Sequence, residues 1–348
     1  MKGLKIFSLA FFSYLFLSVY SNYFDGGLRD VIYSRGFYPS MVVLGVVYAL
    51  IFFGFFAVGY RVGLSPPGWF YAALLFVVSF SEYPFGPIVV VMVIVAVYCL
   101  KEHFTRVLAI YSILTGLLVP LIFYTVFGVP FFHRGLRYEL VGPLVASAFL
   151  GAAGLVYTGA SLKLKTVVLA LLSIIFILGT FRSLLLLIYL AYFLDLYLRG
   201  AFRGDLRAPL AGGIFLGVLI LWMSGGVDAL LVRVGFTFLV FHNIVRLSLP
   251  WGIYHGHLLL SGDPRGTVGA LFGTSVHYTY FFFGQAVADF GVVGVLEAFL
   301  LGLFLRDSED DPKTFAFVLA MFIYAMDPGI DNLILSFVLG ALLIKKLS

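Results

Sequence analysis

Arginine and histidine side chains gather in one segment of the sequence, residues 227–278. The members of this group are Arg233, Arg246, Arg265, His242, His255, His257 and His277. The guanidinium group of arginine is a planar fork that binds two phosphate oxygens at once, and a neutral imidazole accepts a proton from a hydroxyl group near neutral pH. These residue types therefore suit a site that holds a phosphate group and activates a hydroxyl.

The spacing of His242 and Arg246 makes His242 the first candidate for a base. The two residues are four apart, so they share one face of a helix, and the neighbouring guanidinium disfavours the charged imidazolium. His257 and His277 are the second and third candidates. His255 and His257 alternate around a glycine in a stretch that suits contact with a substrate better than precise proton transfer. The alternative is that these histidines only form hydrogen bonds with substrate or with loop backbone.

Carboxylates inside long apolar segments are the other candidates for chemistry, because an ionisable group at membrane depth is costly and usually functional. Asp289 is of this kind and is the fourth candidate for the base. Asp195 lies one helical turn from Arg199, and we expect a structural ion pair there. Asp327 and Asp331 flank a Pro-Gly dipeptide, which is either a simple turn or part of the site.

The elements that carry these residues are too apolar for a water-soluble domain. Hydrophobic residues make up 62% of the 348 positions and charged residues 11%, whereas soluble domains carry about 25% charged residues. Continuous apolar runs such as 41–60 and 107–127 match the roughly 20 residues that a helix needs to cross a bilayer, and the strands of a barrel would alternate instead. We therefore expect an all-α, polytopic membrane helix bundle that forms a single transmembrane domain over residues 1–348.

Hydropathy predicts about twelve membrane-spanning helices. Their expected ranges are 4–24, 41–60, 69–83, 86–100, 107–127, 140–160, 166–179, 184–198, 209–226, 279–305, 314–326 and 332–345. The stretches 69–100 and 166–198 each count as two crossings, because each is broken near its middle. The breaks are Glu82-Tyr83-Pro84 and Gly179-Thr180-Phe181-Arg182-Ser183.

Basic residues set the expected orientation of these helices. With the N-terminus in the cytoplasm, every lysine falls inside and every basic residue outside is an arginine, as the positive-inside rule favours. We therefore expect a multi-pass protein of the cytoplasmic (plasma or inner) membrane with both termini in the cytoplasm. The net charge of +5 reflects this topology, so no nucleic-acid partner is expected. The arginines placed outside are Arg29, Arg35, Arg134, Arg137, Arg182, Arg233, Arg246 and Arg265.

The longest segment between spans, 227–278, is expected outside the membrane. Its first part, Val227–Leu249, has the pattern of an apolar, amphipathic helix with sparse basic residues, which ends at Pro250-Trp251-Gly252. Such a helix lies on the membrane surface or caps a cavity. The glycine-rich stretch after it, residues 255–266, is expected to form an ordered loop over that cavity.

The second half of the chain carries a recognisable pattern of glycine, polar and acidic residues. Its parts are Gly273-Thr274-Ser275-Val276-His277, Gly284-Gln285-Ala286-Val287-Ala288-Asp289-Phe290-Gly291-Val292-Val293-Gly294, and Gly302. This pattern resembles the C-terminal signature of Wzy-type O-antigen and oligosaccharide repeat-unit polymerases. The break at residues 179–183 is similar to the external, arginine-bearing turn of these polymerases and of O-antigen ligases. The resemblance covers roughly residues 166–305, and the short external loop before the sixth span departs from the family pattern.

The resemblance implies a GT-C-like membrane glycosyltransferase that joins lipid-linked oligosaccharides outside the membrane. A glycan would leave its polyprenyl diphosphate and attach to a sugar hydroxyl of another polyprenyl-diphosphate-linked unit. Fixed guanidinium groups stabilise the charge on such a leaving group, and the arginines expected to bind it are Arg182, Arg233, Arg246 and Arg265. Besides membrane lipid, a chain-length regulator and a flippase are the partners that the resemblance suggests.

No cofactor and no metal ion are expected at this site. The sequence has no Asp-x-Asp on an external loop, no metal-ligand spacing and no Walker A or Rossmann fingerprint. Its single cysteine, Cys99, excludes an internal disulfide and a multi-cysteine metal site.

Other functions compete with the polymerase. An O-antigen ligase-type transferase shares the donor and the fold. A polytopic transporter or flippase of lipid-linked oligosaccharide would use broken helices near the bilayer midplane, commonly with internal repeats, and we find no convincing repeat. A structural membrane subunit without catalysis is the third alternative, against which the bias towards external arginine and histidine argues.

Overall fold

Helices are the only regular elements in the part of the chain that the computed structural model describes, which is every residue except 1, 34–41, 81–85, 134, 201–206 and 348. Arg35, Arg134 and the predicted break at residues 82–84 lie outside the described residues. The helices divide into two units. Unit 1 comprises Met1–Val95, Val227–Glu309 and Ala325–Lys346, and unit 2 comprises Ala96–Gly226, Asp310–Tyr324 and Leu347–Ser348.

Five helical stretches are long and apolar enough to cross a membrane. They are α1 (Lys2–Tyr23), α3 (Val43–Val62), residues Val107–Phe127 of α5 (Gly86–Phe127), α11 (Val227–Ser248) and Gly284–Ser308. Shorter apolar helices are α4 (Gly68–Ser79), α7 (Val141–Tyr157), residues Gly212–Ser224 of α10 (Arg207–Ser224) and α16 (Pro312–Tyr324). The all-helical membrane architecture is confirmed, and the count of about twelve spans stays a prediction.

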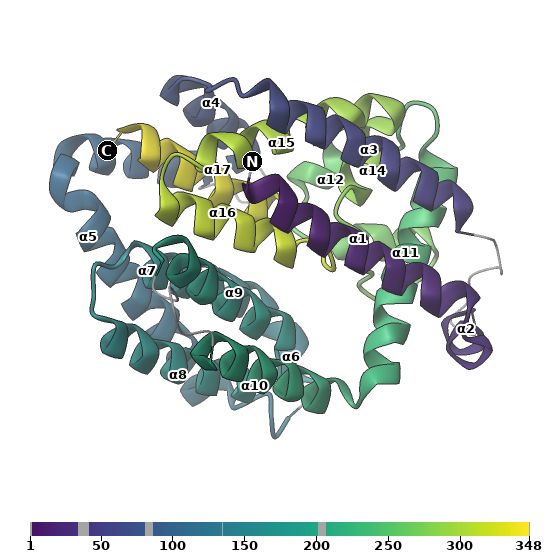
Figure 1. Cartoon of the computed structure of the whole chain (residues 1–348), viewed down its shortest axis with the longest axis horizontal. Coiled ribbons are helices and arrows are strands. Elements are labelled where there is room, and N and C mark those ends of the chain that lie inside the picture. The colour runs from purple at the N-terminus through teal and green to yellow at the C-terminus, as the bar shows by residue number, and fades with distance from the viewer. Residues whose placement is uncertain (1, 34–41, 81–85, 134, 201–206, 348) are drawn as a thin grey trace. The chain divides into compact units, whose positions relative to one another are not determined.

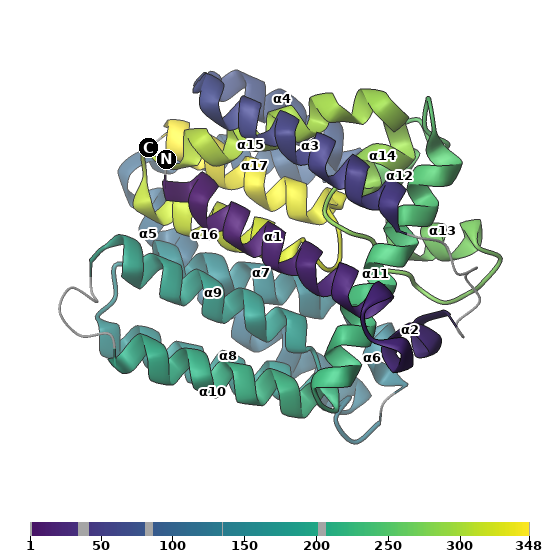
Figure 2. The ribbon, with the colours of Figure 1, turned by 45° about the vertical axis from the view of Figure 1, so that its right-hand side comes forward.

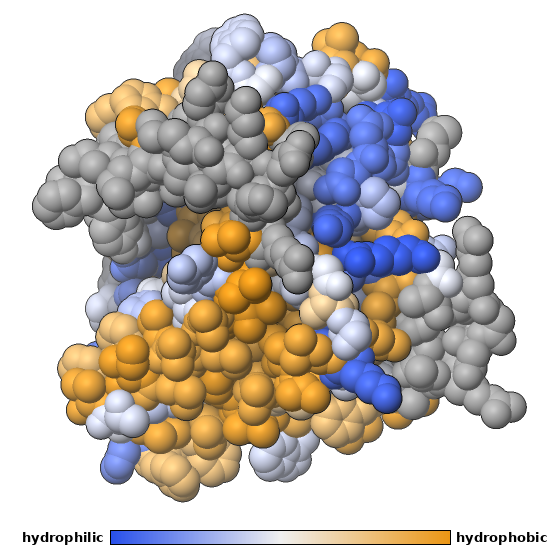
Figure 3. All heavy atoms as spheres, turned by 90° about the vertical axis from the view of Figure 1, so that its left-hand side faces the viewer, coloured by the Kyte–Doolittle hydropathy of each residue, from blue (hydrophilic) through white to orange (hydrophobic). Residues whose placement is uncertain are grey.

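The outward faces of the helices are apolar, as a lipid-solvated protein requires. On α8 (Leu162–Leu178), the exposed side chains include Leu164, Val167, Leu171 and Ile174, each 45–55% exposed. Their spacing of three or four residues puts them on one face of the helix, which in water would be polar. Figure 3 shows a broad hydrophobic area on the molecular surface.

Residues 86–127 form one helix of 42 residues, α5, where the hydropathy pattern predicts two spans, 86–100 and 107–127. The polar residues between those spans contain neither glycine nor proline, and Lys101, Glu102 and Arg106 are good helix formers. The helix therefore continues through the polar residues between the two predicted spans, and the two crossings expected here stay a prediction. Hydropathy reports how a segment is solvated, whereas backbone propensity decides whether a helix continues.

Unit 1 is built around the close packing of α3 on α15 (Val295–Ser308). A side chain on Gly59 would overlap the backbone carbonyl of Phe299, and one on Gly302 would overlap that of Phe56. Glycine at both places lets the two backbones touch, which is how membrane helices commonly pair. The remaining helices of the unit are α2 (Gly26–Tyr33), α12 (His257–Leu260), α13 (Pro264–Leu271), α14 (Gly284–Phe290), η1 (Gly291–Gly294) and α17 (Asn332–Leu347).

The middle of helix α11 is buried on all sides instead of being amphipathic. The four consecutive side chains 238–241 are fully buried, because a helix that is apolar all round buries every face. Figures 1 and 2 show α11 running across α1 and α3 and not alongside them. Asn22, at the end of α1, donates to the carbonyl of Gly235 (3.1 Å), and Gly45, at the start of α3, donates to His242 (3.2 Å). The expected amphipathic surface helix is thus corrected to a buried helix that runs across α1 and α3. Its external position stays a prediction.

Unit 2 packs α9 (Arg182–Leu198) against α7, α8, α10 and α16. A buried ion cluster fixes this arrangement: Lys165 Nζ lies 2.7 Å and Arg199 Nε 2.6 Å from the two carboxylate oxygens of Asp195. Arg199 also donates to the carbonyl of Val156 on α7 (2.9 Å). The predicted pair of Asp195 and Arg199 is confirmed, and Lys165 from α8 is a second cation in it. Removal of one partner would leave a buried charge uncompensated.

Candidate functional site

The break between α8 and α9 is a tight turn that α5 helps to hold. Gly179 has no room for a side chain, because a Cβ there would lie 2.5 Å from the phenol oxygen of Tyr124. That phenol donates to the carbonyl of Ile175 (2.9 Å). Thr180 has a φ of +61°, a left-handed conformation that costs energy for a residue with a side chain and is kept mainly at functional sites. The turn makes Arg182 the first residue of α9.

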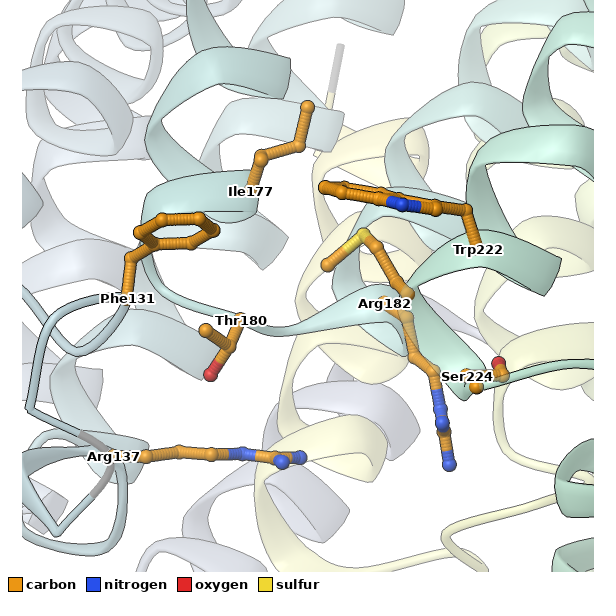
Figure 4. A pocket seen from close by; sticks show the side chains of 9 residues that line it. Phe131, Arg137, Ile177, Thr180, Arg182, Trp222 and Ser224 are labelled. Carbon is orange, nitrogen blue, oxygen red and sulfur yellow. The ribbon is translucent and has the colours of Figure 1, made fainter.

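A cavity of about 570 Å³ opens at this turn, within unit 2. Two arginines, two hydroxyl side chains and several apolar side chains line it; they are Phe131, Arg137, Ile177, Thr180, Arg182, Trp222, Met223, Ser224 and Gly225. Figure 4 shows the side chains of Arg137 and Arg182 on one side of the cavity and the apolar groups of Phe131, Ile177 and Trp222 on the other.

Arg137 is a cavity residue that the sequence analysis does not include among the phosphate ligands. It belongs to the short helix α6 (Leu136–Glu139), and its guanidinium carbon lies 5.0 Å from the centre of the Phe181 ring, a cation–π contact that orients the group. The sequence feature that points to Arg137 as a phosphate ligand is its place among the arginines that the charge pattern puts outside the membrane.

The cavity combines positive charge with an apolar surface, which suits a lipid with an anionic head group. Two guanidinium forks can share the oxygens of a phosphate or diphosphate, and an aromatic and aliphatic wall can take the first part of a hydrocarbon chain. Arg137 and Arg182 are both half-buried, so their charges are screened less than those of fully exposed arginines.

Arg233, a predicted diphosphate ligand, forms an ion pair within unit 1. Its Nε and one terminal nitrogen donate to the same oxygen of Asp327, at 2.8 and 2.6 Å. The other oxygen of Asp327 accepts from the hydroxyls of Tyr14 (3.2 Å) and Thr237 (3.4 Å). This carboxylate therefore ties α11 to α1 and to the turn that precedes α17.

Arg265 and Arg246 differ in their surroundings. Arg265 donates to Asp331 (2.9 Å), and the other oxygen of Asp331 accepts from the backbone of Ile334 (2.8 Å) at the start of α17. The two aspartates that flank the Pro-Gly dipeptide are thus partners of two predicted phosphate ligands. Arg246 is exposed on α11 and has no ion-pair partner in the described part of the chain.

His242, the first candidate for the base, is 3% exposed and sits against the start of α3. The backbone N–H of Gly45 donates to its Nδ1 (3.2 Å), so the proton of the neutral ring resides on Nε2. No hydrogen-bond partner of Nε2 occurs among the described residues. This geometry satisfies one of the orphan N–H groups at a helix N-terminus and leaves His242 no accessible lone pair.

Asp289, the fourth candidate, is fully buried and surrounded by donors. One carboxylate oxygen accepts from the backbone of Leu258 (2.9 Å), and the other accepts from the backbone of Leu259 (2.8 Å) and the amide of Gln285 (2.8 Å). Asp289 therefore holds the N-terminus of α12, the helix that begins at His257, against α14.

The same contact fixes the backbone that carries His255 and His257. The N–H of His255 donates to the carbonyl of Asp289 (3.0 Å), and the N–H of Ile253 donates to that of Ala288 (2.8 Å). His255 has a φ of +50°, which is left-handed and unfavourable for histidine. Both imidazoles are exposed. The glycine-rich stretch is thus a turn, held by backbone hydrogen bonds, that presents two histidines. These contacts agree with the ordered loop expected there.

Tyr254 in this turn has a shifted acidity. Burial raises the pKa of its phenol, and the negative charge of Asp289 raises it further, so the group stays protonated. The phenol donates to the backbone carbonyl of Thr267 (3.1 Å), which ties the turn to α13.

His277 lies in the coil before α14 and pairs with a carboxylate. Its Nε2 is 3.4 Å from Asp263, and both side chains are about half exposed. Asp263 also caps α13 by accepting from the N–H of Gly266 (3.0 Å). A carboxylate in this position can orient an imidazole and leave its other nitrogen available as a proton acceptor.

Asp289 belongs to a buried polar cluster with Gln285 and Glu297. The amide nitrogen of Gln285 donates to both Asp289 and Glu297, at 2.8 and 3.2 Å. Within the described part of the chain, no three histidine, cysteine, aspartate or glutamate side chains lie close enough together to hold a metal ion.

Of the predicted residues, Arg182 thus joins Arg137 at a cavity in unit 2, and His257 and His277 are exposed on one segment of unit 1.

Comparison with known proteins gives one family. Residues 5–337 match the family described as Putative O-antigen polymerase. No curated protein and no solved structure matches the chain. The family match covers nearly the whole sequence and agrees with the apolar helices, the arginine-lined cavity and the pattern around Asp289. The chain therefore belongs to the O-antigen polymerase family.

Proposed function

We propose that this protein joins lipid-diphosphate-linked oligosaccharide repeat units by glycosyl transfer on the external face of the membrane. The observation that carries the proposal is the cavity of unit 2, where Arg137 and Arg182 face an apolar wall, in a chain of this family. A water-soluble anion needs no such wall, and an ordinary lipid-facing surface carries no pair of half-buried guanidinium groups.

The reaction moves one glycan and one proton. The bond between the anomeric carbon of the donor and the diphosphate oxygen breaks, and a bond from that carbon to a sugar hydroxyl of the acceptor forms. The leaving polyprenyl diphosphate gains negative charge, which Arg137 and Arg182 stabilise from fixed positions. The hydroxyl proton passes to a base.

Within unit 1, taken by itself, the candidate for the base is His257. It is exposed at the start of α12, and Asp289 holds the backbone of the next two residues, so the imidazole is presented from a fixed point. His277 is the second candidate, because Asp263 can orient it. Asp289 itself is then a positioning residue, and Arg233 and Arg265 brace the segment through Asp327 and Asp331.

The test of the donor site uses conservative replacement in the purified, reconstituted enzyme. Arg137→Lys and Arg182→Lys keep the charge but remove the fork, and we expect each to lower turnover about 100-fold, the usual cost of one lost donor to a developing anion. Arg29→Lys is the matched control, because Arg29 lies on α2 and pairs only loosely with Asp30 (3.7 Å). Near-normal turnover in both cavity variants would refute the donor site.

The product distinguishes this function from its rivals. A ladder of polymer formed from repeat units as both donor and acceptor supports the polymerase. Transfer only to a different acceptor lipid would identify a ligase-type transferase, and movement of intact lipid-linked oligosaccharide across a liposome membrane without new glycosidic bonds would identify a flippase.

We also propose that transfer needs no metal ion, since two guanidinium groups supply the positive charge that a metal otherwise provides. Polymer formation should then survive an excess of EDTA. A loss of activity that added Mg²⁺ or Mn²⁺ restores would contradict this part of the proposal. A chain-length regulator and a flippase remain the expected partners in the cell.

A further inference from the structure

A second surface cavity lies in unit 1, between the start of α1 and the end of α3. Its volume is about 530 Å³, and its lining is Leu4, Lys5, Ser8, Leu9, Phe12 and Arg61. The two helix ends meet here, because Glu309 accepts from both the backbone of Gly3 and the phenol of Tyr60. None of these residues takes part in the proposed transfer site.

Lys5 and Arg61 differ from the other cations at this end of unit 1. Arg306 pairs with Glu309 (2.5 Å), and Lys346 pairs with Asp307 (2.9 Å). Burial alone would raise the pKa of Glu309, but hydrogen bonds from Tyr60, Gly3 and Arg306 outweigh it and leave the pKa lowered, so this carboxylate is ionised and already matched. Lys5 and Arg61 are exposed and have no ion-pair partner in the described ranges.

The position of the two cations along their helices matches the depth of lipid phosphates. Lys5 lies in the first turn of α1 and Arg61 in the last turn of α3, two helices that are each long and apolar enough to cross a membrane. The ends of such helices lie at the boundary between hydrocarbon and head groups, where basic side chains meet lipid phosphate.

The rest of the cavity is suited to a hydrocarbon chain. Leu9 is 71% and Phe12 45% exposed, and both lie deeper along α1 than Lys5, towards the middle of the helix. Going from the helix end inwards, the cavity therefore changes from two positive charges to an apolar surface. A phospholipid with a negative head group has the same order of charge and hydrocarbon.

We propose that this cavity binds an anionic glycerophospholipid, with the phosphate held by Lys5 and Arg61 and an acyl chain along Leu9 and Phe12. The occupant is a structural lipid of the bilayer and not the substrate of transfer. The charge of the head group distinguishes it from zwitterionic lipids, because only a net negative lipid compensates two unmatched cations.

Native mass spectrometry of the full chain, titrated with phosphatidylglycerol or with phosphatidylcholine of the same acyl chains, tests the proposal. We expect tighter binding of phosphatidylglycerol. Lys5→Gln and Arg61→Gln should each weaken it about fivefold, the effect of one basic residue at a lipid surface, and leave phosphatidylcholine binding unchanged. Lys5→Arg keeps the positive charge and should bind phosphatidylglycerol as tightly as the native protein. Lys163→Gln, which removes an exposed charge at the start of α8, is the matched control.

Two further arms separate the lipid from other anions. Leu9→Asn should weaken the binding of phosphatidylglycerol while both cations remain, because it disturbs the chain and not the head group. Inorganic phosphate or glycerophosphate should not displace the lipid. Equal affinity for both lipids, an unchanged affinity in Lys5→Gln and Arg61→Gln, or displacement by inorganic phosphate would overturn the proposal.

Discussion

At the scale of single residues, hydrogen-bond direction decides what each histidine can do. A base needs a lone pair that substrate can reach. In His242 one ring nitrogen accepts from Gly45 and the other carries the proton inside the protein core. His257 and His277 are exposed. The four-residue spacing of His242 and Arg246 favours His242 as the base. That spacing does not reveal that the first turn of α3 packs against the imidazole ring of His242.

The two exposed histidines lead to a prediction that separates catalysis from stability. His257→Ala should lower turnover at least 100-fold, the usual minimum contribution of a general base, while the donor lipid still binds normally. His242→Ala should instead lower the free energy of unfolding by about 1–3 kcal/mol, because it leaves a buried N–H of α3 without its acceptor. Turnover per folded molecule and thermal unfolding in detergent are the two measurements.

His277→Ala provides the internal comparison for this prediction. If it abolishes turnover while His257→Ala does not, the base is the histidine beside Asp263. If both variants keep most of their activity, neither histidine is the base, and the proposed acceptor side is wrong.

The ion pair of Arg233 and Asp327 carries a second prediction at this scale. Arg233→Lys and Asp327→Asn should behave alike, because both disrupt the same pair. We expect each to lower the unfolding temperature and to leave the KM for donor within about twofold, since a partly exposed pair contributes little beyond local stability. A diphosphate ligand would act differently: Arg233→Lys would raise the KM, while Asp327→Asn would not impair donor binding.

At the scale of elements, close backbone approach explains why the turn before α12 is rigid. Gly252 has a φ of +84°, and a side chain there would overlap the carbonyl of Asp289. On the other side of the contact, Gly291 has a φ of +56° and meets the carbonyl of Pro250. The sequence Asp289-Phe290-Gly291 is therefore part of a structural joint between α14 and the turn, in addition to any role in chemistry.

A pair of glycine variants tests this joint. Gly252→Ala places a methyl group against Asp289, whereas Gly273→Ala meets no atom within 4 Å although its φ is +70°. Both variants incur the cost of about 1 kcal/mol for a left-handed residue with a side chain, so the difference between them reports the contact. We expect Gly252→Ala to lose far more turnover than Gly273→Ala. Equal losses would mean that the joint does not position the histidines.

Sequence patterns predicted those elements whose limits depend on local chemistry. The end of α11 before Pro250 and the break before α9 agree with the structure, because proline and glycine act on the backbone directly. The burial of α11 and the pairing of Arg233 with Asp327 depend on which distant segments meet, and no periodicity encodes that. Arg137 was missed for the same reason: its cavity forms only when α6, α9 and α10 come together within unit 2.

At the scale of the whole molecule, membrane topology depends on whether α11 crosses the bilayer. Its 22 residues are long and apolar enough to do so, and a crossing would place the histidine-bearing segment 249–283 on the side opposite to the residues that precede α11. The structure favours the other arrangement. Within unit 1, α11 runs across α1 and α3 (Figures 1 and 2), and the hydrogen bonds from Asn22 to Gly235 and from Gly45 to His242 join it to the end of α1 and to the start of α3.

We therefore predict that α11 does not cross the membrane and that the segment 249–283 is external. Ser275 is exposed in this segment, whereas Ser261 is 2% exposed and would resist labelling wherever it lay. In a Cys99→Ser background, a membrane-impermeant maleimide should label Ser275→Cys on intact cells. It should label Ser161→Cys, beside the lysines that start α8, only after the membrane is opened. Labelling in the reverse order would place His257 and His277 in the cytoplasm, and the external transfer site could not stand.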